Sequence, residues 1–108
     1  MKELQVSVTA EDIAKGKKMS CTDCPIARAV KRTCDEKSVR GLRKIEIAKG
    51  YLKLYNRNYI QYYRLLDEAY RFYVAFDEGA VVQPLDFQLE LENTLHLSGS
   101  TPLKWEWH

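Results

Sequence analysis

Residues 21–32 read CTDCPIARAVKR, and this stretch decides where the first long helix begins and which side of it is buried. Pro25 suits the first turn of a helix, because the amide hydrogen that proline lacks would have no helical partner there. The capping residue is Thr22, Asp23 or Cys24. The apolar stripe of this helix consists of Ile26, Ala27, Ala29 and Val30. The opposite side carries Arg28, Lys31 and Arg32. We therefore predict an amphipathic helix that ends near Cys34.

A second short signature, FDEG at residues 76–79, marks the end of a later helix. Gly79 is placed to end that helix in the left-handed conformation. Pro84 then opens a strand, because apolar and polar residues alternate after it. The apolar positions of this strand are Leu85, Phe87, Leu89 and Leu91.

The stretch between the two signatures predicts a hairpin and a long helix. Residues 39–55 alternate as two strands around a turn at residues 48–50. Asn58 is placed to cap a helix over residues 59–77. One face of that helix would carry apolar residues at spacings of three and four, namely Tyr59, Tyr63, Leu66, Ala69, Tyr70, Tyr73 and Phe76.

The N-terminal residues predict a strand followed by a short helix. Residues 4–8 alternate apolar and polar side chains. Thr9 can cap a helix over residues 10–15, with Asp12 as a shorter substitute for the usual glutamate of a capping box. Gly16 can end this helix in the left-handed conformation.

These elements predict an α+β fold, a small mixed sandwich in the order strand-helix-strand-strand-helix-strand. The sheet is expected to be mostly antiparallel with the helices on one face, which is compatible with ferredoxin-like and β-grasp-like arrangements. We predict a single domain over residues 1–93. Residues 94–108 form a C-terminal tail that contains Trp105 and Trp107.

Composition limits the class of protein. The chain has 108 residues, of which 45% are hydrophobic and 30% charged, as in a globular domain. It has neither an apolar run long enough to span a bilayer nor an apolar segment of a signal peptide at its start, so we expect no membrane association and a cytoplasmic location. Three cysteines are an odd number that does not suit a disulfide framework.

The cysteines leave three interpretations open. Cys21-x-x-Cys24 is half of a zinc site, which Cys34 and a histidine, His96 or His108, would have to complete. A thiol at a helix N-terminus, such as that of Cys24, is also typical of redox sites. The simplest interpretation is that Cys24 packs as a small apolar side chain. We expect no cofactor and no metal; if a metal binds, its ligands are Cys21, Cys24 and Cys34.

Charged and aromatic residues suggest two binding surfaces. Residues 1–58 carry 14 Lys and Arg against 7 Asp and Glu, whereas residues 59–108 carry 3 against 8. The basic residues expected to contact a nucleic acid are Lys15, Lys17, Lys18, Arg28, Lys31 and Arg32. All seven tyrosines lie between Tyr51 and Tyr73, and those off the predicted helical stripe are surface candidates. The residues expected to bind a protein partner are Tyr55, Arg57, Tyr62, Trp105 and Trp107.

The ordered set of motifs resembles a group of short uncharacterised proteins from actinobacterial phages and related bacterial genomes. The motifs that carry the resemblance are Val6-Ser7-Val8-Thr9-Ala10-Glu11-Asp12-Ile13, Cys24-Pro25-Ile26-Ala27, Phe76 to Gly79 and Pro84 to Phe87. No functional residue is transferred from this group. The resemblance implies a phage-encoded protein that acts in the cytoplasm of a host cell.

No catalytic set can be assembled from the sequence, since the two histidines both lie near the C-terminus. With the resemblance, this favours a non-enzymatic protein that binds a host macromolecule, such as an inhibitor of a defence system in the manner of anti-CRISPR proteins. The alternatives are a small nucleic-acid-binding module and a zinc- or thiol-dependent protein centred on Cys21 and Cys24. The oligomeric state is left open.

Overall fold

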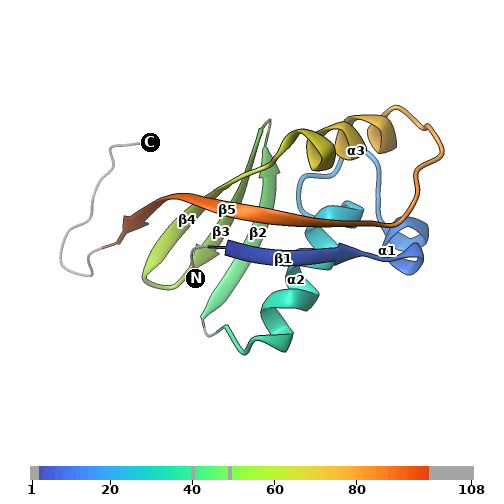
Figure 1. Cartoon of the computed structure of the whole chain (residues 1–108). Helices are drawn as coiled ribbons and strands as arrows, with labels where there is room; N and C mark the ends of the chain where they lie inside the picture. The colour runs from blue at the N-terminus through green and yellow to red at the C-terminus, as the bar shows by residue number, and fades with distance from the viewer. Residues whose placement is uncertain (1–2, 40, 49, 98–108) are drawn as a thin grey trace.

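The computed structural model describes residues 3–39, 41–48 and 50–97. Its elements, shown in Figure 1, are β1 (Glu3–Val8), α1 (Ala10–Lys15), α2 (Pro25–Glu36), β2 (Leu42–Ala48), β3 (Tyr51–Asn56), β4 (Tyr59–Arg64), α3 (Asp67–Asp77) and β5 (Leu85–His96). The predicted α+β class is confirmed. None of the described helices is long and apolar enough to span a membrane.

The described strands form one sheet in the order β1-β5-β4-β3-β2, with every neighbouring pair antiparallel. The predicted hairpin is present as β2 and β3. Because every neighbouring pair is antiparallel, the edge strands β1 and β2 run in the same direction; they are joined by α1 and α2 and have three strands between them. The split β-α-β unit of a ferredoxin-like sheet has one strand between its two parallel strands, so this strand order differs from it.

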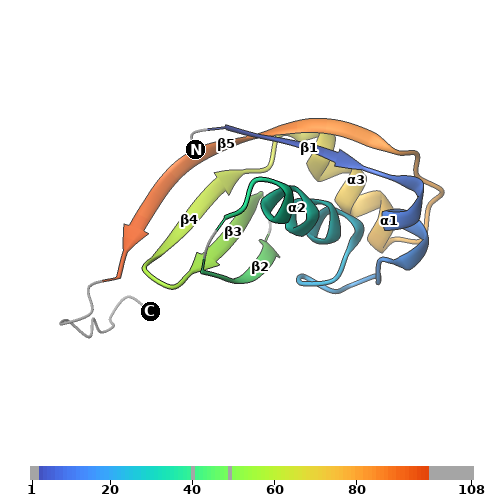
Figure 2. The same cartoon turned by 90° about the horizontal axis from the view of Figure 1, so that it is seen from below.

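The sheet curls so that the helices lie on its concave side, as Figure 2 shows. Helix α2 packs against β1 and also against β2, which are the two edge strands. The helix thus fills the space between the two edges of the curled sheet. The prediction of helices on one face of an antiparallel sheet is therefore confirmed.

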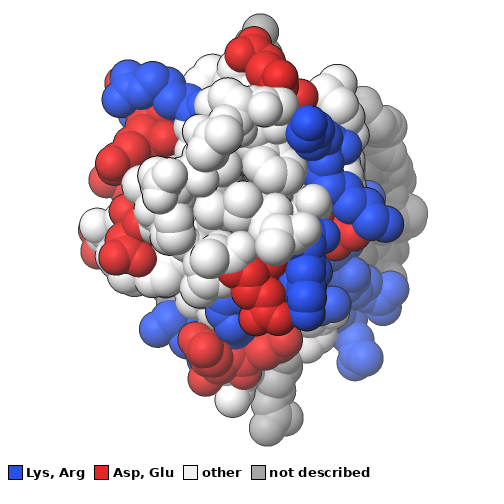
Figure 3. Space-filling view, turned by 90° about the vertical axis from the view of Figure 1, so that its right-hand side faces the viewer, with Lys and Arg blue, Asp and Glu red and all other residues white. Residues whose placement is uncertain are grey.

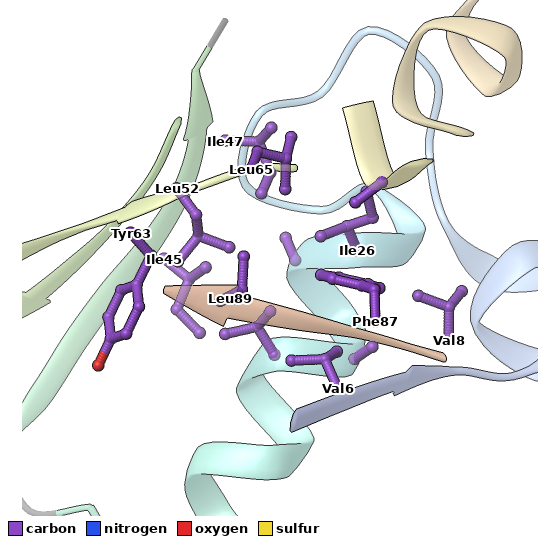
Figure 4. Close-up of a cluster of buried hydrophobic side chains, with 14 of the residues drawn as sticks. Val6, Val8, Ile26, Ile45, Ile47, Leu52, Tyr63, Leu65, Phe87 and Leu89 are labelled. Carbon is purple, nitrogen blue, oxygen red and sulfur yellow. The ribbon is translucent and has the colours of Figure 1, made fainter. Parts of the chain in front are cut away.

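The core lies between the concave side of the sheet and the helices (Figure 4). Alternate residues of each strand point inward, which is the two-residue period expected for a strand with one buried face. In β1 the inward positions are Leu4, Val6 and Val8, and opposite them on β5 lie Leu89, Phe87 and Leu85. The small side chain of Ala27, which is 2% exposed, lets α2 approach the sheet closely.

The predicted helix over residues 59–77 is wrong in its first third. Residues 59–64 form β4 in the middle of the sheet, and the helix begins only at Asp67. The predicted cap, Asn58, belongs instead to the turn between β3 and β4, where its carbonyl oxygen accepts a hydrogen bond from the amide of Leu97 at 2.8 Å. Tyr59 and Tyr63 satisfy a four-residue and a two-residue period alike, so their spacing did not separate helix from strand.

Strand β5 is longer than its apolar alternation indicated. It runs to His96, so residues 94–96 of the predicted tail pair with β4. The rest of that tail, including Trp105 and Trp107, lies outside the described residues.

Two glycines have different roles at helix ends. Gly79 has a φ of +87° after α3, as predicted for a residue that ends a helix. Gly16 has a φ of −69°, so the predicted left-handed conformation is wrong there. A Cβ at Gly16 would lie 2.6 Å from Cδ of Pro25, so glycine is required by the close approach of α2.

The capping box of α1 is complete and extends into an ion pair with α2. The amide of Thr9 donates to Oδ2 of Asp12 at 2.9 Å, and the amide of Asp12 donates to Oγ1 of Thr9 at 3.2 Å. Arg32 binds the same carboxylate with two nitrogens, at 2.8 and 2.9 Å, and also donates to the carbonyl oxygen of Ser7 at 2.7 Å. Asp12 is 1% exposed, so its charge is stabilised almost entirely by these contacts.

We expect Asp12→Asn to lower the free energy of unfolding at pH 7 by about 2–3 kcal/mol, because Arg32 loses its charged partner. Burial raises the pKa of Asp12, but hydrogen bonds from Arg32 and Thr9 outweigh it and hold the pKa below its ordinary value. A carboxyl group with a lowered folded-state pKa stabilises the protein above its unfolded pKa, near pH 4, and this stabilisation is lost as the pH falls further.

Urea unfolding from about pH 7 to pH 3 measures both effects. The wild type should lose more stability on acidification than Asp12→Asn. Glu11→Gln, which changes an exposed carboxylate of the same helix, should unfold at the same urea concentration as the wild type at pH 7. Equal acid sensitivity of the wild type and Asp12→Asn would contradict the role of this carboxylate.

Candidate functional site

The convex side of the sheet carries a group of tyrosines that no described helix covers. Residues paired across β2, β3, β4 and β5 point to the same side, so the registers Lys53 with Tyr62 and Tyr55 with Ile60 bring distant positions together. We name this surface the tyrosine face and define it by Tyr51, Lys53, Tyr55, Ile60, Tyr62 and Leu95. These side chains are exposed or half-buried.

Two hollows lie on this convex side. One has a volume of about 490 Å³ and is lined by Tyr51, Lys53, Tyr62 and Leu95, among others. The other has a volume of about 590 Å³ and is lined by residues that include Tyr55 and Arg57. Such volumes fall in the range of about 300–1,000 Å³ that is common for binding pockets.

Polar contacts fix the orientation of Tyr55. Its hydroxyl donates to Oε1 of Glu46 at 3.0 Å, and Nζ of Lys44 lies 4.8 Å from the centre of its ring. Burial and the bond to Glu46 raise the pKa of Tyr55 to about 12. This tyrosine is therefore a neutral hydrogen-bond donor held in one orientation at neutral pH.

Charges on this side of the sheet are largely balanced. Nζ of Lys44 lies 3.9 Å from Oε2 of Glu46, and a nitrogen of Arg64 lies 3.0 Å from Oε2 of Glu92. Nζ of Lys53 lies 6.0 Å from the centre of the Tyr62 ring. Lys44 and Arg64 are therefore paired with carboxylates, and Lys53 keeps its charge beside a neutral ring, so the convex side carries little net positive charge.

Part of this surface was predictable from the sequence. The structure places Tyr55 and Tyr62 on the tyrosine face and Arg57 in the turn beside Tyr55, whereas Trp105 and Trp107 lie outside the described residues. Tyr51, Ile60 and Leu95 were missed. Residues 59–64 do not alternate between apolar and polar side chains, so no pattern in the sequence placed Ile60 beside Tyr62.

The basic residues proposed for nucleic acid are mostly engaged by carboxylates. Arg32 binds Asp12, and Nε of Arg28 lies 3.9 Å from the same carboxylate. Lys15 pairs with Glu11 at 2.8 Å, and Lys17 lies 3.7 Å from Asp23. Lys18 lies beside Gly79, and Lys31 is exposed on α2. The structure thus uses Arg28 and Arg32 to hold α1 on α2, which reduces the charge available to phosphate groups.

The cysteines occupy three different environments. Sγ of Cys24 caps α2 by accepting a hydrogen bond from the amide of Ala27 at 3.5 Å, and burial raises its pKa. Burial also raises the pKa of Cys34 to about 11. Cys21 is exposed, and its Sγ lies 3.7 Å from Glu46. A raised pKa is the opposite of what the redox interpretation of Cys24 requires.

No group of three or more metal-binding side chains occurs within the described ranges. His96 lies on β5 against the ring of Tyr59, and His108 is outside the described residues. The ligand set Cys21, Cys24 and Cys34 is therefore not assembled in this part of the chain.

A second uncovered surface lies at the end of the molecule that bears α1 and the loop after α3. Figure 3 shows an uncharged area there, bordered by acidic groups on one side and basic groups on the other. Met19 is 80% exposed and Val81 is 91% exposed, and the amide of Met19 donates to Oδ1 of Asp77 at 3.0 Å. We take the tyrosine face as the candidate site, because it combines hollows with oriented tyrosines.

Comparisons of the chain with models of known protein families, with curated proteins and with solved structures found no match.

We expect one cysteine to react rapidly in the folded protein and three in the unfolded protein. Cys21 is exposed, whereas Cys24 and Cys34 are buried with raised pKa values, so their thiolates are scarce at pH 8. Titration with a chromogenic disulfide reagent, with and without denaturant, measures these numbers.

The same protein should keep its melting temperature after dialysis against a chelator, because the cap of α2 is a hydrogen-bonded thiol. Rapid labelling of Cys24, or a lower melting temperature after chelation, would contradict this assignment. Cys21→Ser serves as the control, since it should remove the fast reaction and leave folding unchanged.

Proposed function

We propose that this chain is a non-enzymatic binding protein that docks on a protein partner through the tyrosine face. The observation that carries the proposal is a sheet surface, uncovered in the described structure, with Tyr51 and Tyr62 in the lining of one hollow and Tyr55 in the lining of a second. Tyrosine is enriched among the residues that dominate binding energy at protein interfaces. The raised pKa values of Cys24 and Cys34 count against the thiol-dependent alternative, because a thiol with a raised pKa is a poor nucleophile.

The rigid placement of the tyrosines favours binding. They stand on paired strands rather than on loops, and Tyr55 is held by Glu46 and Lys44. Less conformational entropy is therefore lost when a partner covers them. The local balance of charge favours a protein surface over the phosphates of a nucleic acid, whose binding depends on unpaired basic residues.

The resemblance to phage proteins narrows the proposal. On that ground the partner is a host protein in the cytoplasm, and binding inhibits a host defence component. The narrower proposal rests on the resemblance alone, whereas the choice of the tyrosine face rests on the geometry.

The partner can be identified by photocrosslinking from within the proposed interface. We expect Tyr62→p-benzoylphenylalanine to crosslink one protein in cells that express the chain. As a control, p-benzoylphenylalanine in place of Gln88, which lies on the same side of the sheet but towards β1, should not crosslink that protein. The captured protein is then purified and titrated with the unmodified chain. A crosslink that forms equally from position 88 would argue against this face.

In that titration, Tyr62→Ala and Tyr55→Ala should each weaken binding by at least about tenfold, which corresponds to about 1.4 kcal/mol. Gln88→Ala should change the dissociation constant less than about twofold. Thermal unfolding checks that each variant is folded. Unchanged affinity of folded Tyr62→Ala would refute the proposed face.

A second candidate function uses the same face for single-stranded nucleic acid. It is favoured by lysines over two tyrosine rings on an open sheet, since stacking and phosphate contacts combine in such sites. Fluorescence anisotropy with labelled oligothymidylate at about 50 and about 200 mM salt tests it. Binding that falls steeply with salt and is lost in Tyr62→Ala would favour this function over protein binding; absence of binding at the lower salt concentration would exclude it.

A further inference from the structure

The free edge of β2 carries backbone hydrogen-bonding groups that have no partner strand among the described residues. In an antiparallel pair, alternate residues bond to the partner strand and the others point away from it. Ala48 and Tyr51 flank the turn between β2 and β3, so Ala48, Glu46 and Lys44 face β3. Ile45 and Ile47 therefore direct their amide and carbonyl groups to the opposite side, where β2 has no described neighbouring strand.

The chain itself uses part of this edge. The amide of Ile47 donates to the carbonyl oxygen of Cys21 at 2.7 Å, which confirms that this residue points away from β3. The loop before α2 thus occupies the edge at Ile47 and stops there. Ile45, two residues along, has the same orientation and receives no backbone hydrogen bond from the described part of that loop.

A groove lies between this open part of the edge and α2. It has a volume of about 470 Å³, and its lining includes Ala27 and Lys31 from α2, Val39 from the following loop, and Leu42, Arg43 and Ile45 from β2. We name it the edge groove. It has an apolar floor beside a strand edge and a helix for its other wall, which is the form of site that accepts an extended peptide as an added strand.

The charges of the edge groove indicate the chemistry of its occupant. Lys31, Arg43 and Lys44 line it, against one carboxylate, Asp35. Neither Lys31 nor Arg43 forms an ion pair within the described ranges. A segment with acidic side chains would neutralise these two residues on binding.

We propose that the edge groove binds an acidic peptide segment in extended conformation, which pairs with β2 through the amide and carbonyl of Ile45. The apolar side chains of the segment contact Val39 and Leu42, and its carboxylates meet Lys31 and Arg43. This site is separate from the tyrosine face, because it uses the edge of the sheet rather than its convex side.

The test uses the ¹⁵N-labelled full chain and a capped hexapeptide of alternating glutamate and valine. Chemical-shift changes should concentrate on residues 41–47 and on α2. Hydrogen exchange at the amide of Ile45 should slow by at least about tenfold when the peptide is saturating, because that amide gains a backbone partner. Exchange at Glu46, which already bonds to β3, should not change. The same hexapeptide with lysine in place of glutamate is the matched ligand control and should not bind.

Charge-reversal variants test whether Lys31 and Arg43 bind the carboxylates of the peptide. Lys31→Glu combined with Arg43→Glu should weaken peptide binding by at least about tenfold, and Lys31→Glu alone, at an exposed site of α2, should act in the same direction. Lys15→Glu combined with Arg71→Glu makes the same change in net charge at exposed positions outside the groove and should leave binding unchanged.

The proposal is overturned if the acidic peptide does not bind, if both peptides bind equally, or if the shifts map to the tyrosine face. Chemical-shift changes at β2 without slower hydrogen exchange at Ile45 would overturn strand addition. Chemical shifts at β2 that depend on protein concentration in the absence of peptide would overturn it too, because the edge would then be a contact between two copies of the chain. Tyr62→Ala should bind the peptide normally, so either binding proposal can fail while the other holds.

Discussion

The structure depends on one packing constraint: α2 lies between the two edge strands of a curled sheet and must approach both of them. Ala27 and Ala29 give it the small face that this approach needs, and both are almost fully buried. The orientation of the helix is fixed by Pro25 and Cys24 at its start and by the bond from Arg32 to Asp12 on its side. The core, the convex tyrosine face and the edge groove follow from this position of α2.

The fold class could be predicted from sequence because most elements have unambiguous ends. The ends of helices and strands are marked by Pro25, Gly79 and Pro84. The alternation of apolar and polar residues over 4–8 and 85–91 matches strands with one buried face. Strand β4 could not be identified in this way, because residues 59–64 carry aromatic or apolar side chains on both faces and their tyrosines also suit a helical period. Central position in the sheet, a tertiary property, decides the conformation of these residues.

The candidate site was predictable only in part for the same reason. Tyr55 and Tyr62 were chosen because they lie off a helical stripe, and the structure brings them together through strand pairing instead. For the basic residues Arg28 and Arg32, the sequence predicted a binding surface that the structure does not provide. Their number and spacing indicated a charged surface, but one buried carboxylate, Asp12, engages both of them and turns them into structural residues.

The pairing of β1 with β5 has a consequence for the order in which the chain folds. Strands β2, β3 and β4 are joined by short turns, so they can form a local three-stranded unit early. Strand β1 pairs instead with residues 85–90, which lie far from it along the sequence, and closing so long a loop is slow. We therefore infer that the first strand docks late, after α2 and β5 have created the gap that it fills.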